Sequence, residues 1–467
     1  MGTSIFRPPS STRDRPGWHI RRLASLGSFF QARGGSKEDD VDAGVPCIRY
    51  GDLYTTYDIH IQRVRRHVPP EVARGYTPLQ SGDIVMASSG EAIADIGKCA
   101  VLLGQQTVVC GGDIVVLRPS FGVNPRFLAY ALNAEPHRKQ ISRRSSGTMI
   151  IHTSVGKLKD VRISLPSAEE QAAIVKYLVH ADARINKAIA AKCRLRHLLQ
   201  EQKHALSRTF VRQAASEAPS RVPSGLAWLG EVPSEWVEHR AKAILRDVDE
   251  RSTSGLEEVL SVSHLTGVTP RSEKQITMFE AASYVGHKLC QPDDLVVNTM
   301  WAWMAALGVS RHHGLVSPAY NVYRPRREGV VATEFLAHLL RSQPYNDMFR
   351  MYSTGIRPSR LRFYPDQMLA TPIFLPPAEE QRRIVRRLAD GTAETDGAIS
   401  RVEDEMDLLR ELRHRLIADA VTGQIDVRDM AASLAGTDNT EAWGEAEFSR
   451  DFEPADFNGV LEASEGT

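Results

Sequence analysis

The chain has 467 residues, with 58 Lys and Arg against 57 Asp and Glu, so its formal net charge is +1. Its content of 42% hydrophobic and 25% charged residues excludes a collagen, a mucin or a mostly disordered chain. At about 150 residues per domain, the length predicts about three domains.

Membrane and secreted proteins are disfavoured by what the sequence lacks. No apolar run approaches the roughly 20 residues that span a bilayer. Residues 1–18 are rich in Arg, Pro and Ser and lack the apolar core of a secretory signal. The five cysteines are widely spaced and form neither a disulfide framework nor a zinc pattern. These features predict a cytoplasmic protein with reduced thiols and no membrane association.

Residues 1–160 predict a first globular domain of mixed α/β structure with short strands. Turn sequences such as Gly111-Gly-Asp113 separate apolar, β-branched stretches. A helix is expected over 125–133, because Asn124 is a good N-cap and Pro125 suits a first helical turn. The expected strands cover residues 47–50, 84–86, 107–110 and 114–117.

Residues 161–215 predict a helical region. Pro166 ends an extended stretch, and Glu169 and Glu170 suit the positive end of a first, short helix. A longer helix is then expected, because apolar residues recur at heptad spacing from Ala181 to Thr209 with two polar interruptions.

Residues 216–370 predict a second globular domain, and residues 371–428 a second helical region. Strands are expected at 295–298 and 320–323, followed by a helix from about Thr333. An apolar heptad stripe then runs from Ile399 to Ala420. The remaining residues, 429–467, are expected to form an acidic, disordered tail.

The part of the chain before the acidic tail is basic. Residues 430–467 contain nine acids and one base, a net charge of −8, so the rest of the chain carries +1 − (−8) = +9. The tail either weakens non-specific binding to an anionic partner or serves as a solubilising end, and we favour the second interpretation.

The chain contains an internal duplication. The segment Leu165–Gln171 recurs as Leu375–Gln381, at an offset of 210. Over the 47 positions from Leu165 to Val211, 18 residues are identical at this offset, where chance gives about three. Shorter matches extend upstream, such as Gly147 with Gly355. Because the helical parts are similar and the globular parts diverge, we infer one shared structural role and two different recognition roles.

The duplicated helices have two possible arrangements. They are either ordinary core helices or the two halves of an antiparallel intramolecular coiled coil with pseudo-twofold symmetry. In the second case a helix of about 30 residues, roughly 45 Å long, forms a rigid spacer between the globular domains. The duplication favours the coiled coil.

Loops in both globular segments mix basic, aromatic and small polar residues, as in Arg49–Tyr54, Asn298–Trp303 and Gly355–Arg360. Such side chains neutralise phosphates and read base edges. For any one loop, a solvated turn or a buried aromatic is the commoner interpretation. Phosphate-binding loops, dinucleotide fingerprints, amino-methyltransferase motifs, zinc-protease motifs and nuclease motifs are all missing. The sequence therefore favours a recognition protein over an enzyme.

Several phrases together resemble the specificity subunit of type I restriction–modification systems. The resemblance covers about residues 17–428 and includes the order of the phrases as well as the duplication. The phrases lie at 44–54, 111–115, 165–171, 228–236, 260–264, 298–303, 316–320, 375–381 and 421–428.

The resemblance implies two target recognition domains, each reading one half of an asymmetric bipartite site in double-stranded DNA, with the helices setting the gap. It implies no catalytic centre and no cofactor in this chain. It also implies two modification subunits, which methylate adenine with S-adenosylmethionine, and ATP-driven restriction subunits as partners.

The resemblance further suggests DNA contacts on loop positions of the matching phrases. In the first domain the expected contacts are Arg49, Tyr50, Tyr54, Ser88, Ser89, Thr148 and His152. In the second they are His264, Arg271, Asn298, Trp301, Ser317, Tyr320, Arg357 and Arg360.

Two other functions remain open from the sequence. One is a coiled-coil scaffold that does not bind DNA, which predicts no salt-dependent DNA affinity. The other is a DNA enzyme with a diverged catalytic centre, which predicts that the purified chain alone cleaves or methylates DNA.

Overall fold

The structure is a computed structural model, and its described parts fall into two compact units. It describes residues 16–35, 37–90, 93, 95–104, 107–147, 151–216, 220–273, 283–355 and 361–434. Unit 1 holds the described residues up to Ala191 and those from Met406 onward, and unit 2 holds Lys192–Glu405. The predicted contacts Thr148, Arg357 and Arg360, and residues 435–467 of the predicted tail, lie outside the described residues.

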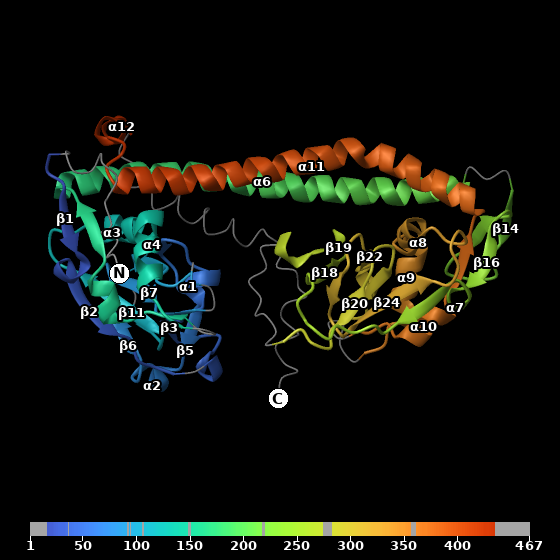
Figure 1. The fold of residues 1–467 in the computed structure, drawn as a ribbon, viewed down its shortest axis with the longest axis horizontal. Helices are drawn as coiled ribbons and strands as arrows, with labels where there is room; N and C mark the ends of the chain where they lie inside the picture. Colours follow the sequence, from blue (N-terminus) through green and yellow to red (C-terminus); the bar gives the residue numbers. More distant parts are fainter. Residues whose placement is uncertain are drawn as a thin grey trace. The chain divides into compact units, whose positions relative to one another are not determined.

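The strands of unit 1 include a five-stranded and a four-stranded sheet (Figure 1). Their bounds are β1 His19–Arg22, β2 Gly27–Gln31, β3 Val45–Ile48, β4 His60–Ile61, β5 Arg66–Val68, β6 Thr77–Leu79, β7 Ile84–Ala87, β8 Ser89–Gly90, β9 Cys99–Leu102, β10 Val108–Cys110, β11 Ile114–Pro119, β12 Ile151–His152 and β13 Arg162–Leu165. The larger sheet has the order β2-β11-β7-β9-β4, and the smaller one β5-β3-β10-β6. Two short pairs, β1 with β13 and β8 with β12, complete the described strands.

The central strands β7 and β9 of the larger sheet are apolar along their whole length because both faces are covered. In β7, Ile84 and Met86 face one apolar cluster, whereas Val85 and Ala87 face another. The first cluster includes helix α3, Pro125–Asn133, whose N-cap Asn124 accepts hydrogen bonds from two backbone N–H groups, as predicted. The other helices that begin in unit 1 are α1 Asp52–Thr55, α2 Pro70–Ala73, α4 Glu135–Arg144, α5 Val155–Lys159, α6 Ala168–Ser216 and α12 Arg428–Ser433.

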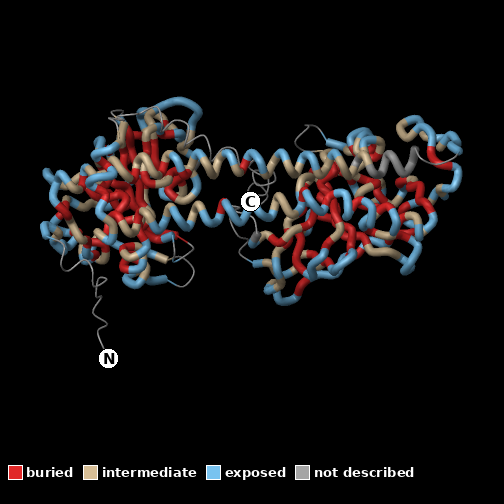
Figure 2. The backbone as a smooth tube through the Cα atoms, turned by 90° about the horizontal axis from the view of Figure 1, so that it is seen from above, coloured by how far each residue is buried: buried red, intermediate tan, exposed pale blue. Residues whose placement is uncertain are grey.

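Unit 2 repeats this plan with a four-stranded antiparallel sheet of order β17-β24-β21-β22. Its strands are β14 Arg221–Pro223, β15 Glu231–Pro233, β16 Val237–Arg240, β17 Leu245–Val248, β18 Leu260–Ser263, β19 Gly267–Pro270, β20 Lys288–Cys290, β21 Leu295–Asn298, β22 Leu307–Val309, β23 Gly314–Val316, β24 Tyr320–Pro325 and β25 Pro372–Leu375. The helices that begin in it are α7 Ala241–Ile244, α8 Thr333–Leu340, α9 Gln343–Tyr352, α10 Pro365–Ala370 and α11 Ala378–Val421. In each unit the buried residues gather inside the sheets and the helices packed on them (Figure 2).

The prediction of mixed helix and strand structure is confirmed, and so are the helices at 125–133 and from Thr333 and the expected strands except one. The strand expected at 47–50 lies two residues earlier, at Val45–Ile48. One expectation is wrong: no break separates a short first helix from a long one. The helix α6 runs for 49 residues because no Gly or Pro interrupts it. No helix in the described ranges combines the length and hydropathy needed to cross a membrane.

A buried glutamine explains the duplicated sequence at the start of each long helix. In unit 1, Gln171 is 1% exposed; its Oε1 accepts a hydrogen bond from the Asn124 backbone N–H at 2.8 Å, and its Nε2 donates to the Pro166 carbonyl at 2.9 Å. In unit 2, Gln381 makes the same two bonds, with Ala332 N–H and the Pro376 carbonyl. We call these residues the glutamine clamps. Each joins a strand end, the N-cap of a sheet-covering helix and a long helix.

A bidentate ion pair is duplicated as well. Asp83 is 1% exposed and accepts two hydrogen bonds of 2.8 Å from Arg118. In unit 2, Asp294 accepts two from Arg324, at 2.7 and 2.8 Å. Arg118 and Arg324 are therefore each held in a structural ion pair within their own unit.

The C-terminal part of α11 completes the core of unit 1. Ile417, Ala420 and Val421 belong to the same apolar cluster as α3 and the start of α6. Nearby, Arg413 bonds to Asp182 on α6 at 3.0 Å and also pairs with Asp58. Burial lowers the pKa of Arg413, but the two carboxylates outweigh this effect and raise the pKa overall. The largely covered Arg413 side chain therefore stays charged and fixes the end of α11 within unit 1.

The clamp predicts a specific stability loss. In the Gln171→Leu variant, the buried Asn124 N–H and Pro166 carbonyl lose their partner, so we expect unit 1 to lose about 2–4 kcal/mol of unfolding free energy. Denaturant unfolding measures this loss. The control Gln202→Leu makes the same change at an exposed position of α6, and we expect it to change stability by under about 0.5 kcal/mol. Equal effects of the two variants would contradict the clamp.

The buried ion network makes a second prediction. Arg413→Met leaves Asp58 and the buried Asp182 without their cation, so we expect a loss of about 3–5 kcal/mol. Thermal and denaturant unfolding measure the loss. Arg415→Met removes an exposed arginine from the same helix turn and serves as the control. A loss no larger than that of the control would show that the network does not stabilise unit 1.

Candidate nucleic-acid interface

Three distant segments of unit 1 bring Ser89, Asp113 and His152 together. The antiparallel pair of β8 and β12 places His152 opposite Ser89. The Ser89 hydroxyl lies 2.9 Å from Asp113 Oδ1 and 2.9 Å from His152 Nδ1. Asp113 lies in the turn before β11 with a φ of 58°, a left-handed conformation that Asp tolerates better than most residues. We call these three residues the Ser89 cluster.

Tyr54 covers the cluster from α1. Its hydroxyl donates to the Ser89 carbonyl at 2.7 Å, and its ring meets exposed Tyr50 edge-on at 6.3 Å. Burial raises the pKa of Tyr54 well above its usual value, and the nearby charge of Asp95 raises it further. The phenol therefore remains a hydrogen-bond donor. A Cβ on Gly90 would lie 2.8 Å from the Tyr54 hydroxyl oxygen, so this close approach needs glycine.

Basic side chains lie next to His152 in the chain and in space. The His152 backbone exchanges hydrogen bonds with Ser146, which lies two residues after the end of α4. The last turn of α4 carries the exposed Arg143 and Arg144, and Lys157 Nζ donates to the Ser146 hydroxyl at 2.7 Å. This surface can hold a phosphate backbone beside the cluster.

Two other predicted contacts, Ser88 and Arg49, are engaged in hydrogen bonds within unit 1. Ser88 is 4% exposed; its backbone N–H donates to the Asp113 carbonyl and its carbonyl accepts from Thr153. The guanidinium of Arg49 bonds to Asp40 at 2.6 and 2.9 Å and to the Gly35 carbonyl at 3.2 Å. Burial lowers the pKa of Arg49, but Asp40 raises it overall. Arg49 therefore holds the loop that carries Tyr50 and Tyr54.

In unit 2, Asn298 and Trp301 lie at the end of β21. Asn298 is fully buried; its Oδ1 accepts from the Met300 N–H, and its Nδ2 has no hydrogen-bond partner among the described residues. Trp301 is 9% exposed and stacks on Trp303 with a centroid separation of 5.6 Å. The Arg350 guanidinium lies 5.7 Å from the Trp303 ring centre. Trp301 is therefore largely covered, whereas the half-buried Trp303 and the exposed Arg350 are suited to contact with bases or phosphates.

The remaining described candidates of unit 2 are spread over three loops. Ser317 and Tyr320 form one turn beside Asn298, since Tyr320 pairs with Asn298 and its N–H donates to the Ser317 carbonyl. His264 is half-buried, and its carbonyl accepts from Arg341. Arg271 is half-buried and begins a 3₁₀ turn after β19. No described contact links these last two residues to Asn298.

Sequence reasoning missed Asp113 and Arg362. Asp113 was noted only as a turn residue, although its phrase also carried the family resemblance. Arg362 exchanges backbone hydrogen bonds with Thr354, just as His152 does with Ser146. The recurrence of Gly147 as Gly355, beside Ser146 and Thr354, was the available signal. Unit 2 thus places an arginine where unit 1 places a histidine.

The Ser89 cluster does not have the arrangement of a hydrolase. In a catalytic triad the histidine lies between the serine and the carboxylate, and it accepts the serine proton. Here the serine lies between the histidine and Asp113, so the carboxylate holds the hydroxyl instead of orienting the imidazole. The cluster is suited to hydrogen bonding rather than to nucleophilic attack.

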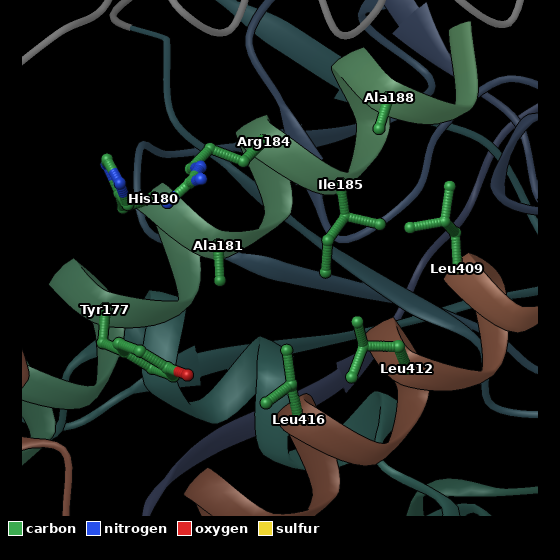
Figure 3. A pocket seen from close by; sticks show the side chains of 9 residues that line it. All are labelled: Tyr177, His180, Ala181, Arg184, Ile185, Ala188, Leu409, Leu412 and Leu416. Carbon is green, nitrogen blue, oxygen red and sulfur yellow. The ribbon is translucent and has the colours of Figure 1, made fainter. Parts of the chain in front are cut away.

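An apolar groove forms a second surface of unit 1. It has a volume of about 340 Å³ and lies between the first half of α6 and the last part of α11 (Figure 3). Its Leu412 is 46% exposed. The lining residues are Tyr177, His180, Ala181, Arg184, Ile185, Ala188, Leu409, Leu412 and Leu416.

Comparisons with known proteins find a family match in the first part of the chain. Residues 17–193 match the family model described as the type I restriction modification DNA specificity domain. A comparison with curated proteins finds no matching relative.

Solved structures of type I systems are similar at low sequence identity. A chain from a study of complex assembly and conformational transition of a type I R-M system is 18% identical, with a TM-score of 0.49, covering 88% of this chain and 99% of that one. The HsdS subunit from Thermoanaerobacter tengcongensis is 17% identical, with a TM-score of 0.37 and coverages of 91% and 100%. The S subunit from M. genitalium is 14% identical, with a TM-score of 0.33 and coverages of 87% and 97%.

All three TM-scores lie below 0.5, so the assignment rests on the sequence match, and the Ser89 cluster lies inside the matched range. Residues 17–193 are thus similar to the type I restriction modification DNA specificity domain.

Proposed function

We propose that this chain is the non-catalytic, DNA-reading subunit of a type I restriction–modification complex. Residues 1–160 and 216–370 each read one half of an asymmetric bipartite site in double-stranded DNA. Residues 161–215 and 371–428 form an antiparallel coiled coil that sets the gap between the half-sites. The chain docks modification and restriction subunits, which supply the chemistry.

The repeated bonding pattern, with different side chains at matching positions of the two units, carries this proposal. Both units keep the glutamine clamp, the Asp–Arg pair and the backbone bridge that holds His152 or Arg362. An imidazole and a guanidinium present different hydrogen-bonding groups, so the same backbone arrangement can read two different base sequences. The charge of +9 on residues 1–429 supports binding to a polyanion.

Ion pairs between the helix halves support the antiparallel arrangement. Within unit 2, Lys192 pairs with Glu405 and Lys203 with Asp396, so rising numbers on α6 meet falling numbers on α11. Within unit 1, Asp182 meets Arg413 in the same sense. Cys193 is buried while Leu195 of the predicted stripe is 41% exposed, so the packed face of α6 departs locally from the heptad pattern.

Genome-wide methylation mapping tests the function. With its cognate modification subunit co-expressed, the chain is expected to direct adenine methylation to a two-part motif with a fixed unspecified gap. A contiguous motif would contradict the bipartite model, and a chain that cleaves or methylates DNA alone would favour the enzyme. DNA affinity should fall steeply as salt increases, because phosphate contacts release counterions. A scaffold would show no such dependence.

We propose that the apolar groove of unit 1 docks the modification subunit, because Leu412 leaves apolar surface open beside a charged helix face. Leu412→Glu is expected to weaken co-purification with the modification subunit at least about tenfold, since a carboxylate enters the apolar contact. DNA binding by the chain alone should persist. Leu408→Glu, at a neighbouring position that is 64% exposed and outside the groove, is the matched control. Equal loss in both variants would place the docking elsewhere.

A further inference from the structure

The hydrogen bonds of the Ser89 cluster determine which ring nitrogen of His152 carries a proton. The Ser89 hydroxyl has one hydrogen and lies 2.9 Å from both Asp113 Oδ1 and His152 Nδ1. An ionised carboxylate only accepts hydrogen bonds, so the hydroxyl must donate to the exposed Asp113. The serine oxygen must then accept from Nδ1–H. In the neutral imidazole, Nε2 is therefore unprotonated and is an acceptor.

His152 is fixed in place at both its backbone and its side chain. Its N–H and carbonyl bond to Ser146 at 2.9 and 3.1 Å, and β12 pairs it with Ser89 on the other side. Nδ1 is tied to Ser89, while the residue is exposed and Nε2 has no hydrogen bond to any residue that the structure describes. The result is a preorganised acceptor on the surface beside Arg143, Arg144 and Lys157.

A lone acceptor selects a donor on the base. In the major groove the donors on base edges are the exocyclic amino groups, N6 of adenine and N4 of cytosine, whereas guanine O6 and N7 and thymine O4 are acceptors. We propose that His152 Nε2 accepts a hydrogen bond from one such amino group in the half-site read by unit 1. Ser89 and Asp113 are positioning residues that fix the imidazole tautomer. This inference rests on the proposed function and assigns a recognition role to one atom.

Base analogues that lack the amino group provide the test. In one set of duplexes, unsubstituted purine replaces adenine at each position of the half-site in turn. In a second set, pyrimidin-2-one, which has hydrogen in place of the 4-amino group, replaces cytosine. The complex of the chain with its modification subunit is expected to bind one of these analogue duplexes about tenfold more weakly than the parent, because a fixed acceptor is left without a donor. His152→Ala should bind parent and analogue equally at that position. Sensitivity at every other position should be unchanged.

Three further variants separate recognition from folding. Ser89→Ala frees the imidazole to change tautomer and should reduce the sensitivity at the same position, whereas Ser89→Thr keeps the hydroxyl and should restore it. His152→Lys replaces the acceptor with a donor and should reverse the preference there, toward a base that presents an oxygen. His19→Ala removes another exposed histidine of unit 1 and should leave every position unchanged.

The outcomes distinguish this inference from the function on which it rests. If His152→Ala stays as sensitive to the missing amino group as the unchanged protein, while the two-part motif remains, the role of His152 is wrong and the function stands. If the unchanged complex shows no sequence-dependent binding at all, both are wrong. Loss of binding by His152→Ala to every duplex, with an unchanged melting temperature, would also overturn the role, because it would indicate a non-specific contact.

Discussion

The glutamine clamp is the contact on which the rest of each unit depends. A single buried amide satisfies a backbone N–H at the N-cap of one helix and a carbonyl at the end of a strand. Buried backbone groups are costly without partners, so these bonds fix the helix that covers the sheet relative to the long helix. The end of the strand that leads into each long helix is tied to that helix by the same side chain. This requirement is purely structural, which is why the sequence around it is duplicated while the loops diverge.

The Ser89 cluster illustrates how a rigid frame can display variable chemistry. Its members come from β8, β12 and the turn before β11. Backbone hydrogen bonds hold each of these segments in addition to the side-chain bonds of the cluster. Tyr54 remains protonated and closes the cluster from α1. Unit 2 keeps the corresponding bridge but carries Arg362, and it adds a stacked tryptophan pair. Exchange of single side chains on such a frame changes the donors and acceptors presented and leaves the fold intact.

Much of the fold could be predicted from the sequence because its signals are local. The N-cap Asn124 and Pro125 determine the start of α3, and the apolar runs of β7 and β11 predict strands. The continuous α6 was missed because the heptad pattern begins late, although no residue in it breaks a helix. Candidate contacts were harder to place, because an arginine in a loop looks the same whether or not it is already paired. The partner of Arg49 is Asp40, and the burial of Asn298 depends on β24; neither relation is visible in a local motif.

The path of the chain through the two cores has an evolutionary consequence. Unit 1 is built from two separate stretches, because Ile417, Ala420, Val421 and Val427 complete a core that begins near residue 18. Among the described residues, unit 2 is one continuous stretch, Lys192–Glu405, whose two ends lie inside the long helices α6 and α11. A recombination event with both breakpoints inside those helices can replace unit 2 without opening the first core. The reverse exchange needs a donor that supplies both outer pieces together, so the two units are not equally free to change.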